Sequence, residues 1–109
     1  DFDTLYGHRN DPQGMASTLE AFDKELPRIV ETIGDGDLLV MTADHGNDPV
    51  TPSTDHSREY VPILCYSRSR QVGKNIGTRS TFADLGKTVA EFFGVKNSLS
   101  GASFLAEVN

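Results

Sequence analysis

The sequence predicts an α/β fold in which a mainly parallel sheet is flanked by helices. The apolar run Leu38–Met41, without polar alternation, is typical of a strand that is covered on both faces. Val61–Tyr66 is a second apolar strand, in which Pro62 is best placed near the start or at an edge. Two amphipathic stretches, residues 11–33 and 81–94, are typical of helices that pack on a sheet. We therefore expect the helices to cover the faces of a sheet whose strands are buried.

The first ten residues are expected to form the end of a strand followed by a loop, with Gly7 as its flexible point. Asp3 and His8 are five residues apart, which does not suit one face of a helix. A loop that turns back would still bring both side chains to one ion.

Residues 11–33 are expected to form a long helix. Asp11 is the predicted N-cap, and Pro12 follows in the first turn, where its missing N–H does no harm. Apolar residues at spacings of three and four form one stripe that should pack on the sheet: Met15, Leu19, Phe22, Leu26, Ile29 and Ile33. Pro27 lies inside this pattern and should kink the helix or split it in two.

The first predicted strand runs into Asp44, His45 and Gly46. Open α/β folds bind ligands at the carboxyl edge of the sheet, so a carboxylate and an imidazole at this point suit a metal site. A turn-forming aspartate beside an exposed histidine explains the same residues about equally well. The polar loop Pro49–Asp55 follows and can fold back over this edge, with His56 at its end.

The last third of the chain is expected to hold one more helix. Thr81–Asp84 resembles a capping box at its start, and Gly94 should end it. Phe104 and Leu105 in the tail are expected to pack locally.

Composition narrows the class of protein. The 109 residues fit one domain with a modest core, and the start at Asp1, without a methionine, suggests a fragment of a larger protein. A net charge of −6 without a Lys/Arg cluster argues against nucleic-acid binding, and no apolar stretch approaches a membrane span of roughly 18 residues. The single Cys65 excludes an internal disulfide and favours the cytoplasm.

The three histidines each follow an acidic residue: His8 follows Asp3, His45 follows Asp44, and His56 follows Asp55. Carboxylates and imidazoles together suit borderline divalent ions such as Zn²⁺ or Mn²⁺. Because one ion needs fewer ligands than this set offers, a two-metal site for phosphoryl transfer is the predicted chemistry.

Three separated motifs carry a resemblance to known proteins. Residues 42–47, Thr-Ala-Asp-His-Gly-Asn, resemble the metal-binding signature of the alkaline phosphatase superfamily. Residues 1–12 and 55–62, in register with it, closely resemble the phosphopentomutase family. The family of cofactor-independent phosphoglycerate mutases, the nearest rival, typically has Val-Gly-His-Thr-Gly where this chain has Tyr-Gly-His-Arg-Asn.

The resemblance implies roles for five residues. Asp3, His8 and His56 match the family's ligands for one metal ion, and Asp44 and His45 match those for the other. It also implies two divalent ions, usually Mn²⁺, and interconversion of ribose or deoxyribose 1-phosphate and 5-phosphate through a phosphorylated threonine.

The resemblance further implies that residues 1–109 are the C-terminal portion of an alkaline-phosphatase-like catalytic core. The nucleophilic threonine, one more metal-binding aspartate and the cap domain are expected in a missing N-terminal part. The chain would then supply metal ligands but no catalytic residue, and would be inactive alone.

Four further residues have weaker predicted roles around the metal ligands. Asp48, Asp55 and Arg58 could orient ligands, and Arg9 could bind a phosphate. A solvated loop charge explains each of them at least as well.

Alternative functions stay open at this point. The chain could be the metal-binding part of a phosphopentomutase, a non-catalytic metal-binding or interaction module, or part of a phosphatase or phosphoglycerate mutase of the same superfamily. The expected partners are a phosphopentose and the remainder of the polypeptide, without nucleic acid or membrane. Self-association is plausible because a truncated sheet exposes an edge and apolar surface.

Overall fold

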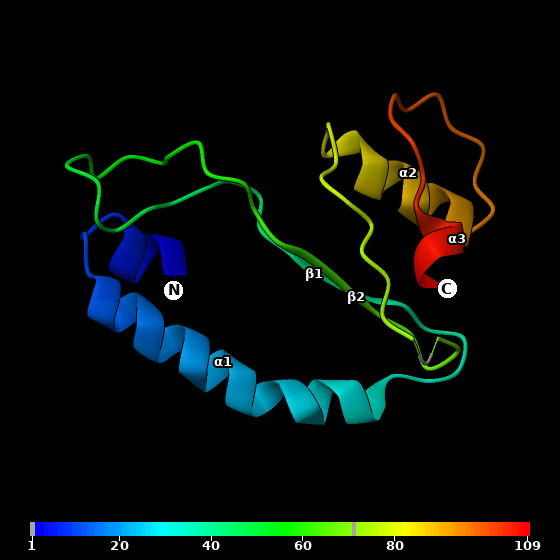
Figure 1. The fold of residues 1–109 in the computed structure, drawn as a ribbon, viewed down its shortest axis with the longest axis horizontal. Coiled ribbons are helices and arrows are strands. Elements are labelled where there is room, and N and C mark those ends of the chain that lie inside the picture. Colours follow the sequence, from blue (N-terminus) through cyan, green and yellow to red (C-terminus); the bar gives the residue numbers. More distant parts are fainter. Residues whose placement is uncertain (1, 71) are drawn as a thin grey trace. The chain divides into compact units, whose positions relative to one another are not determined.

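The computed structural model describes residues 2–70 and 72–109 and contains six elements (Figure 1). They are the π-helix η1 (Phe2–Gly7), α1 (Pro12–Thr32), β1 (Leu39–Thr42), β2 (Ile63–Tyr66), α2 (Ala83–Phe92) and α3 (Leu105–Val108). The chain divides into two compact units. The first unit comprises the chain up to Ile33 together with Leu39–Leu64, and the second comprises Gly34–Leu38 and Cys65–Asn109.

The chain begins with η1 rather than with the predicted strand end. The N–H of His8 donates to the carbonyl of Asp3 at 3.0 Å, a spacing of five residues that closes one π-helical turn. A strand needs a neighbour to bond its backbone groups, whereas this helical turn bonds them within the segment. The predicted strand end is therefore wrong at Phe2 and Asp3, and the start of the predicted loop is helical as far as Gly7, while Asp1 lies outside the described residues.

Helix α1 begins as predicted. Oδ1 of Asp11 accepts a hydrogen bond from the N–H of Gly14 at 2.8 Å, so Asp11 is the N-cap, and Pro12 is the first helical residue. A Cβ on Gly14 would lie only 2.3 Å from a ring atom of Tyr6 in η1. This close contact packs the start of α1 on η1.

Helix α1 continues through Pro27, so the predicted split is wrong. Pro27 has no N–H to donate to the carbonyl of Asp23, four residues earlier. Because Asp23 is exposed, water can bond to that carbonyl, and one lost hydrogen bond does not end a helix of 21 residues.

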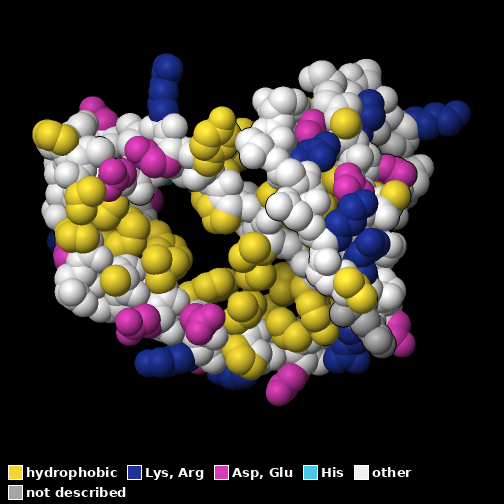
Figure 2. Space-filling view, viewed as in Figure 1, with side chains coloured by type: hydrophobic (Ala, Val, Ile, Leu, Met, Phe, Trp, Pro, Cys, Tyr) yellow, Lys and Arg dark blue, Asp and Glu magenta, His cyan; other side chains and the backbone are white. Residues whose placement is uncertain are grey.

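The apolar stripe of α1 does not pack on a sheet in the described part of the chain. The helix has no buried residue, and Leu19 and Phe22 are 54% and 41% exposed. Figure 2 shows hydrophobic side chains gathered at the surface along this helix. The predicted amphipathic helix is present, but its apolar face is uncovered.

Strands β1 and β2 form a two-stranded sheet. Oγ1 of Thr42, at the end of β1, donates to the carbonyl of Pro62, just before β2, at 2.8 Å, so the strands run antiparallel. A parallel pair needs a crossover, usually a helix, whereas residues 43–62 double back without one. The described residues therefore do not confirm the mainly parallel sheet that the sequence predicted.

The second unit has its small core between α2 and the C-terminal tail. Phe104 and Val108 are 1% and 7% exposed, and the N–H of Phe104 donates to Oγ1 of Thr88 at 3.0 Å. Local packing of Phe104 is thus confirmed. Helix α2 ends before Gly94, whose φ of 64° suits a helix C-terminus, as predicted.

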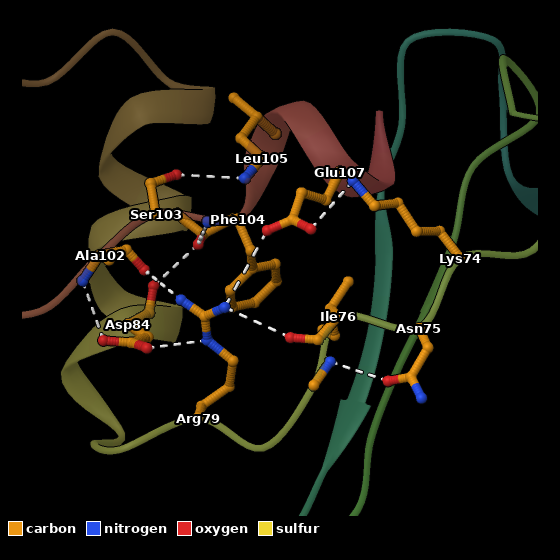
Figure 3. A network of polar contacts seen from close by, with 12 residues as sticks. Lys74, Asn75, Ile76, Arg79, Asp84, Ala102, Ser103, Phe104, Leu105 and Glu107 are labelled. Atoms are coloured by element: carbon orange, nitrogen blue, oxygen red, sulfur yellow. Dashed lines mark hydrogen bonds and ion pairs between the residues drawn. The ribbon is translucent and has the colours of Figure 1, made fainter.

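A polar network joins the tail to α2, and it replaces the predicted capping box (Figure 3). The carboxylate of Asp84 accepts from Nε of Arg79 at 2.8 Å and from the N–H of Ala102 at 2.9 Å. Since this carboxylate is turned toward Arg79 and Ala102, it does not reach back to Thr81. The hydrogen bond from Ala102, together with the Arg79 guanidinium, lowers the pKa of Asp84 below its ordinary value.

Among residues 2–70 and 72–109, no helix is both long and apolar enough to cross a membrane.

Candidate metal centre

Three of the predicted ligands lie together, because two imidazoles face one carboxylate oxygen of Asp3. Oδ1 of Asp3 lies 3.4 Å from Nε2 of His8 and 3.4 Å from Nε2 of His56. The ligand atoms of all three residues lie within 4.8 Å of one another. Their side chains are 39–48% exposed, so a divalent ion could enter from solvent.

The π-helical turn explains how Asp3 and His8 come together. Side chains five residues apart lie on nearly the same side of a π-helix, whereas on an α-helix they would lie on different sides. The turn also places Asn10 in a left-handed conformation with φ of 50°, which asparagine tolerates, before α1 begins.

His45 joins the cluster through a ring stack. Its imidazole lies on that of His56, with the ring centroids 3.6 Å apart and the planes inclined by 15°. Its Nε2 is 4.0 Å from Oδ1 of Asp3 and 3.8 Å from Oδ1 of Asp44. The carboxylate of Asp44 itself is 92% exposed, so this predicted ligand lies at the edge of the cluster.

A backbone bridge places His45 beside His56. Gly46 and Ser57 form an antiparallel bridge, in which the N–H of Ser57 donates to the carbonyl of Gly46 at 3.1 Å. A Cβ on Gly46 would lie 2.7 Å from the carbonyl oxygen of Ser57, so only glycine allows this approach. The loop after β1 therefore folds back over the strand end, as the sequence predicted.

Two carbonyl groups orient the imidazoles. Nδ1 of His8 is hydrogen-bonded to the carbonyl of Thr54, and Nδ1 of His45 to the carbonyl of Gly46 at 3.1 Å. A carbonyl only accepts, so Nδ1 is the nitrogen that donates in each ring, and in the neutral imidazole the free lone pair is then on Nε2. This is the tautomer in which Nε2 can bind a metal ion.

In the described residues, the side chains predicted to surround the ligands make no hydrogen bond or ion pair with the cluster. Oδ1 of Asp48 accepts from the N–H of Val50 at 2.9 Å, which stabilises its own turn. Asp55, Arg9 and Arg58 are exposed, and within the described ranges no polar contact joins their side chains to Asp3 or the histidines. Backbone carbonyls orient the ligands instead, and sequence offers no signal for these.

Sequence reasoning also missed a contact of Asn47. Its Nδ2 donates to Oδ1 of Asp3 at 3.0 Å. The available signal was an amide side chain two residues after His45, inside the motif of residues 42–47. That signal is weak by itself, because an asparagine after a glycine is also common in turns.

The donor set suits a borderline divalent cation. One carboxylate oxygen and two or three imidazole nitrogens are the ligands that Zn²⁺ and Mn²⁺ accept, and an ion held by so few side chains keeps positions for oxygen atoms of a substrate. The only cysteine is no part of this set. Burial raises the pKa of the Cys65 thiol, so it stays protonated and weakly nucleophilic.

Comparisons with known proteins agree with this chemistry. A sequence model described as Metalloenzyme superfamily matches residues 1–97. A protein named phosphopentomutase from Dictyoglomus thermophilum is 62% identical over 108 residues, which are 99% of this chain and 28% of that relative. Proteins of the same name from Anaeromyxobacter sp. (strain K) and Desulfitobacterium hafniense (strain Y51) are 64% and 55% identical over 99% of the chain. The chain thus spans about a quarter of the length of these curated relatives, 27–28%.

Proposed function

This chain belongs to the Metalloenzyme superfamily, and we propose on that premise that it is the metal-binding part of a phosphopentomutase. The observation that carries the proposal is the convergence of Asp3, His8 and His56, from segments almost fifty residues apart, on one carboxylate oxygen. The relatives that match the whole chain at 55–64% identity carry this name.

In the proposed centre, Asp3, His8 and His56 hold one divalent ion through Oδ1 and two Nε2 atoms. Asp44 and His45 contribute to a second ion, together with ligands from the rest of the protein. Mn²⁺ is the proposed metal. Such ions neutralise phosphate charge and stabilise the attacking and leaving oxygens during phosphoryl transfer.

The chain's own groups have three roles in this proposal. Asp3 and the three imidazoles fix the ligand geometry. The carbonyls of Thr54 and Gly46 accept from Nδ1 of His8 and His45, so that Nε2 of the neutral rings faces the ion, and the exposed side of the cluster at Asp44 admits a phosphate. The substrate is a ribose or deoxyribose phosphate. The threonine that carries the phosphoryl group lies in another part of the protein. In the complete protein, β1 and β2 join a larger, mainly parallel sheet.

One observation favours a second candidate, a metal-binding chain without catalysis. Because the Asp44 carboxylate is 92% exposed and His45 stacks on His56, only one ion-binding group of three ligands is formed by the described residues. Activity then depends on whether the remainder of the protein is present.

The test is turnover of ribose 5-phosphate and ribose 1-phosphate by the complete protein with Mn²⁺. Activity should be lost on chelation and should fall at least 100-fold, together with bound metal, in His56→Ala, because the ion loses one of its imidazole ligands. The exposed Lys96→Ala variant, which leaves the centre intact, should keep the wild-type rate. Full activity of the complete protein in excess chelator would overturn the proposal.

A further inference from the structure

We propose that Asn47 is a positioning residue that orients the Asp3 carboxylate for metal binding. The inference rests on the proposed metal-binding function and adds a residue to it. The ligand group of carboxylate and imidazole atoms consists of Asp3, His8 and His56, and Asn47 meets it through its Nδ2, an N–H donor that cannot bind a cation. Its amide acts through the carboxylate of Asp3.

The first observation is the hydrogen bond between two distant motifs. Nδ2 of Asn47 donates to Oδ1 of Asp3 at 3.0 Å, and the two residues are 44 positions apart. The same oxygen faces Nε2 of His8 and of His56 at 3.4 Å. An aspartate side chain that is 40% exposed would otherwise rotate and bond to water, so a fixed donor selects the rotamer that points at the imidazoles.

The second observation is that Gly7 holds the amide in place. A Cβ on Gly7 would lie 2.0 Å from Nδ2 and 2.6 Å from Cγ of Asn47, so the amide rests directly on the glycine backbone. Gly7 is buried, and it is not among the glycines with positive φ. Its small size, rather than the flexibility predicted from the sequence, is what this position requires.

The lack of charge on Asn47 also suits this role. An amide donates a hydrogen bond to the carboxylate without adding a positive charge that would compete with the metal ion. A lysine or arginine here would neutralise Asp3 and weaken its attraction for a cation. Asn47 therefore fixes the ligand and leaves its negative charge available.

The experiment is a Zn²⁺ titration of the 109-residue chain against a competing chelator. Asn47→Leu keeps the approximate size of the side chain but removes the donor, and should weaken Zn²⁺ binding by about 10- to 100-fold. Gly7→Ala should weaken it in the same direction, because its Cβ displaces the amide. Asn97→Leu is the matched control and should bind as the wild type does, because Asn97 lies outside the cluster and its side chain bonds to Val95 and Leu99.

A second pair of variants separates positioning from a merely structural effect. In an Asp3→Ala background, Asn47→Leu should cause no further loss of affinity, because the group that Asn47 orients is gone. An equal loss in both backgrounds, or wild-type affinity of Asn47→Leu, would overturn the inference and leave the metal site standing. If the folded wild-type chain binds no Zn²⁺, the proposed function fails and the inference fails with it. Should Asn47→Leu lose the wild-type circular dichroism spectrum, Asn47→Ala replaces it in the same scheme.

Discussion

The two carboxylates that sequence assigned to metal binding have very different surroundings. Asp3 is partly enclosed and lies near all three imidazoles, at 3.4, 3.4 and 4.0 Å, whereas Asp44 is 92% exposed and lies near His45 alone. A carboxylate surrounded by preformed ligands gains more from a bound ion than one that must first be ordered. We therefore expect Asp3 to contribute more than Asp44 to metal binding in this chain.

This ranking predicts the metal stoichiometry of the chain. The 109 residues should bind one Mn²⁺ tightly, measured by electron paramagnetic resonance of the free ion. Asp3→Asn should weaken this binding by more than the 10- to 100-fold typical of residues that only orient ligands, because it removes a ligand charge. The matched variant Asp44→Asn should change the affinity by less than about 3-fold. Two tightly bound ions, or equal losses in both variants, would contradict the ranking.

The proximity of Asp3, His8 and His56 agrees with the prediction from sequence, because both the motif resemblance and the pairing of acid with imidazole pointed to it. The contacts of Asn47 and of the Thr54 carbonyl were not predicted, although Asn47 lies inside the motif of residues 42–47. They depend on how two loops meet, and neither residue type has a pattern that marks such a meeting. The assignment of metal-ligand roles to these residues stays a prediction.

At the scale of elements, local rules predicted α1 and α2 well. The N-cap of Asp11, the proline in the first turn and the end of α2 before Gly94 all follow from interactions within a few residues. The capping box at Thr81 failed because Asp84 has a stronger partner outside the helix, the guanidinium of Arg79. Its side chain is 22% exposed, and that of Asp84 only 4%. Where the local sequence pattern allows more than one hydrogen-bond partner for a side chain, tertiary contacts determine which partner it takes.

The Asp84 network predicts a pH dependence for the second unit. Since the pKa of Asp84 is lower in the folded state than in the unfolded state, the unfolded chain binds more protons in acid. The stability that this carboxylate contributes is therefore full above its ordinary pKa of about 3.9 and is lost as the pH falls through the lowered folded value.

Thermal unfolding followed between neutral and acidic pH tests this element. Asp84→Asn should lower the melting temperature at neutral pH, and its difference from the wild type should shrink as the pH falls below about 4. The exposed Asp35→Asn is the control and should follow the wild type throughout. A difference that stays constant over this range would show that the charge of Asp84 does not stabilise the tail.

At the scale of the whole molecule, the predicted α/β class holds, while the described residues do not confirm the mainly parallel sheet. The described strands are one antiparallel pair, and the apolar face of α1 is uncovered. The pattern of apolar and polar residues shows that one face of a helix is suited to burial, but it does not identify the segment that covers this face. With relatives about four times as long, we expect the remainder of the polypeptide to cover this face.

That expectation gives a test with one substitution in two proteins. Phe22, 41% exposed on α1, should be replaceable by alanine in the 109-residue chain with a loss of less than about 1 kcal/mol in the free energy of unfolding. In the complete protein the same Phe22→Ala should cost about 3–5 kcal/mol, as for a buried phenylalanine. Urea denaturation of both pairs measures the difference, and equal small losses would mean that α1 stays uncovered.

The exposed face also predicts self-association of the isolated chain, since contiguous apolar surface of this kind is rare in monomers. Sedimentation of the 109 residues over a range of concentrations should show it. Leu19→Lys together with Phe22→Lys should restore a monomer, whereas a wild-type chain that stays monomeric at high concentration would exclude association through α1.

The shared ion of Asp3, His8 and His56 is the central claim, and an anomalous-scattering map at the manganese absorption edge tests it most directly. In crystals of the complete protein grown with Mn²⁺, the account predicts a peak bonded at once to Oδ1 of Asp3 and to Nε2 of His8 and His56. A map whose manganese peaks all lie away from these three atoms would contradict it.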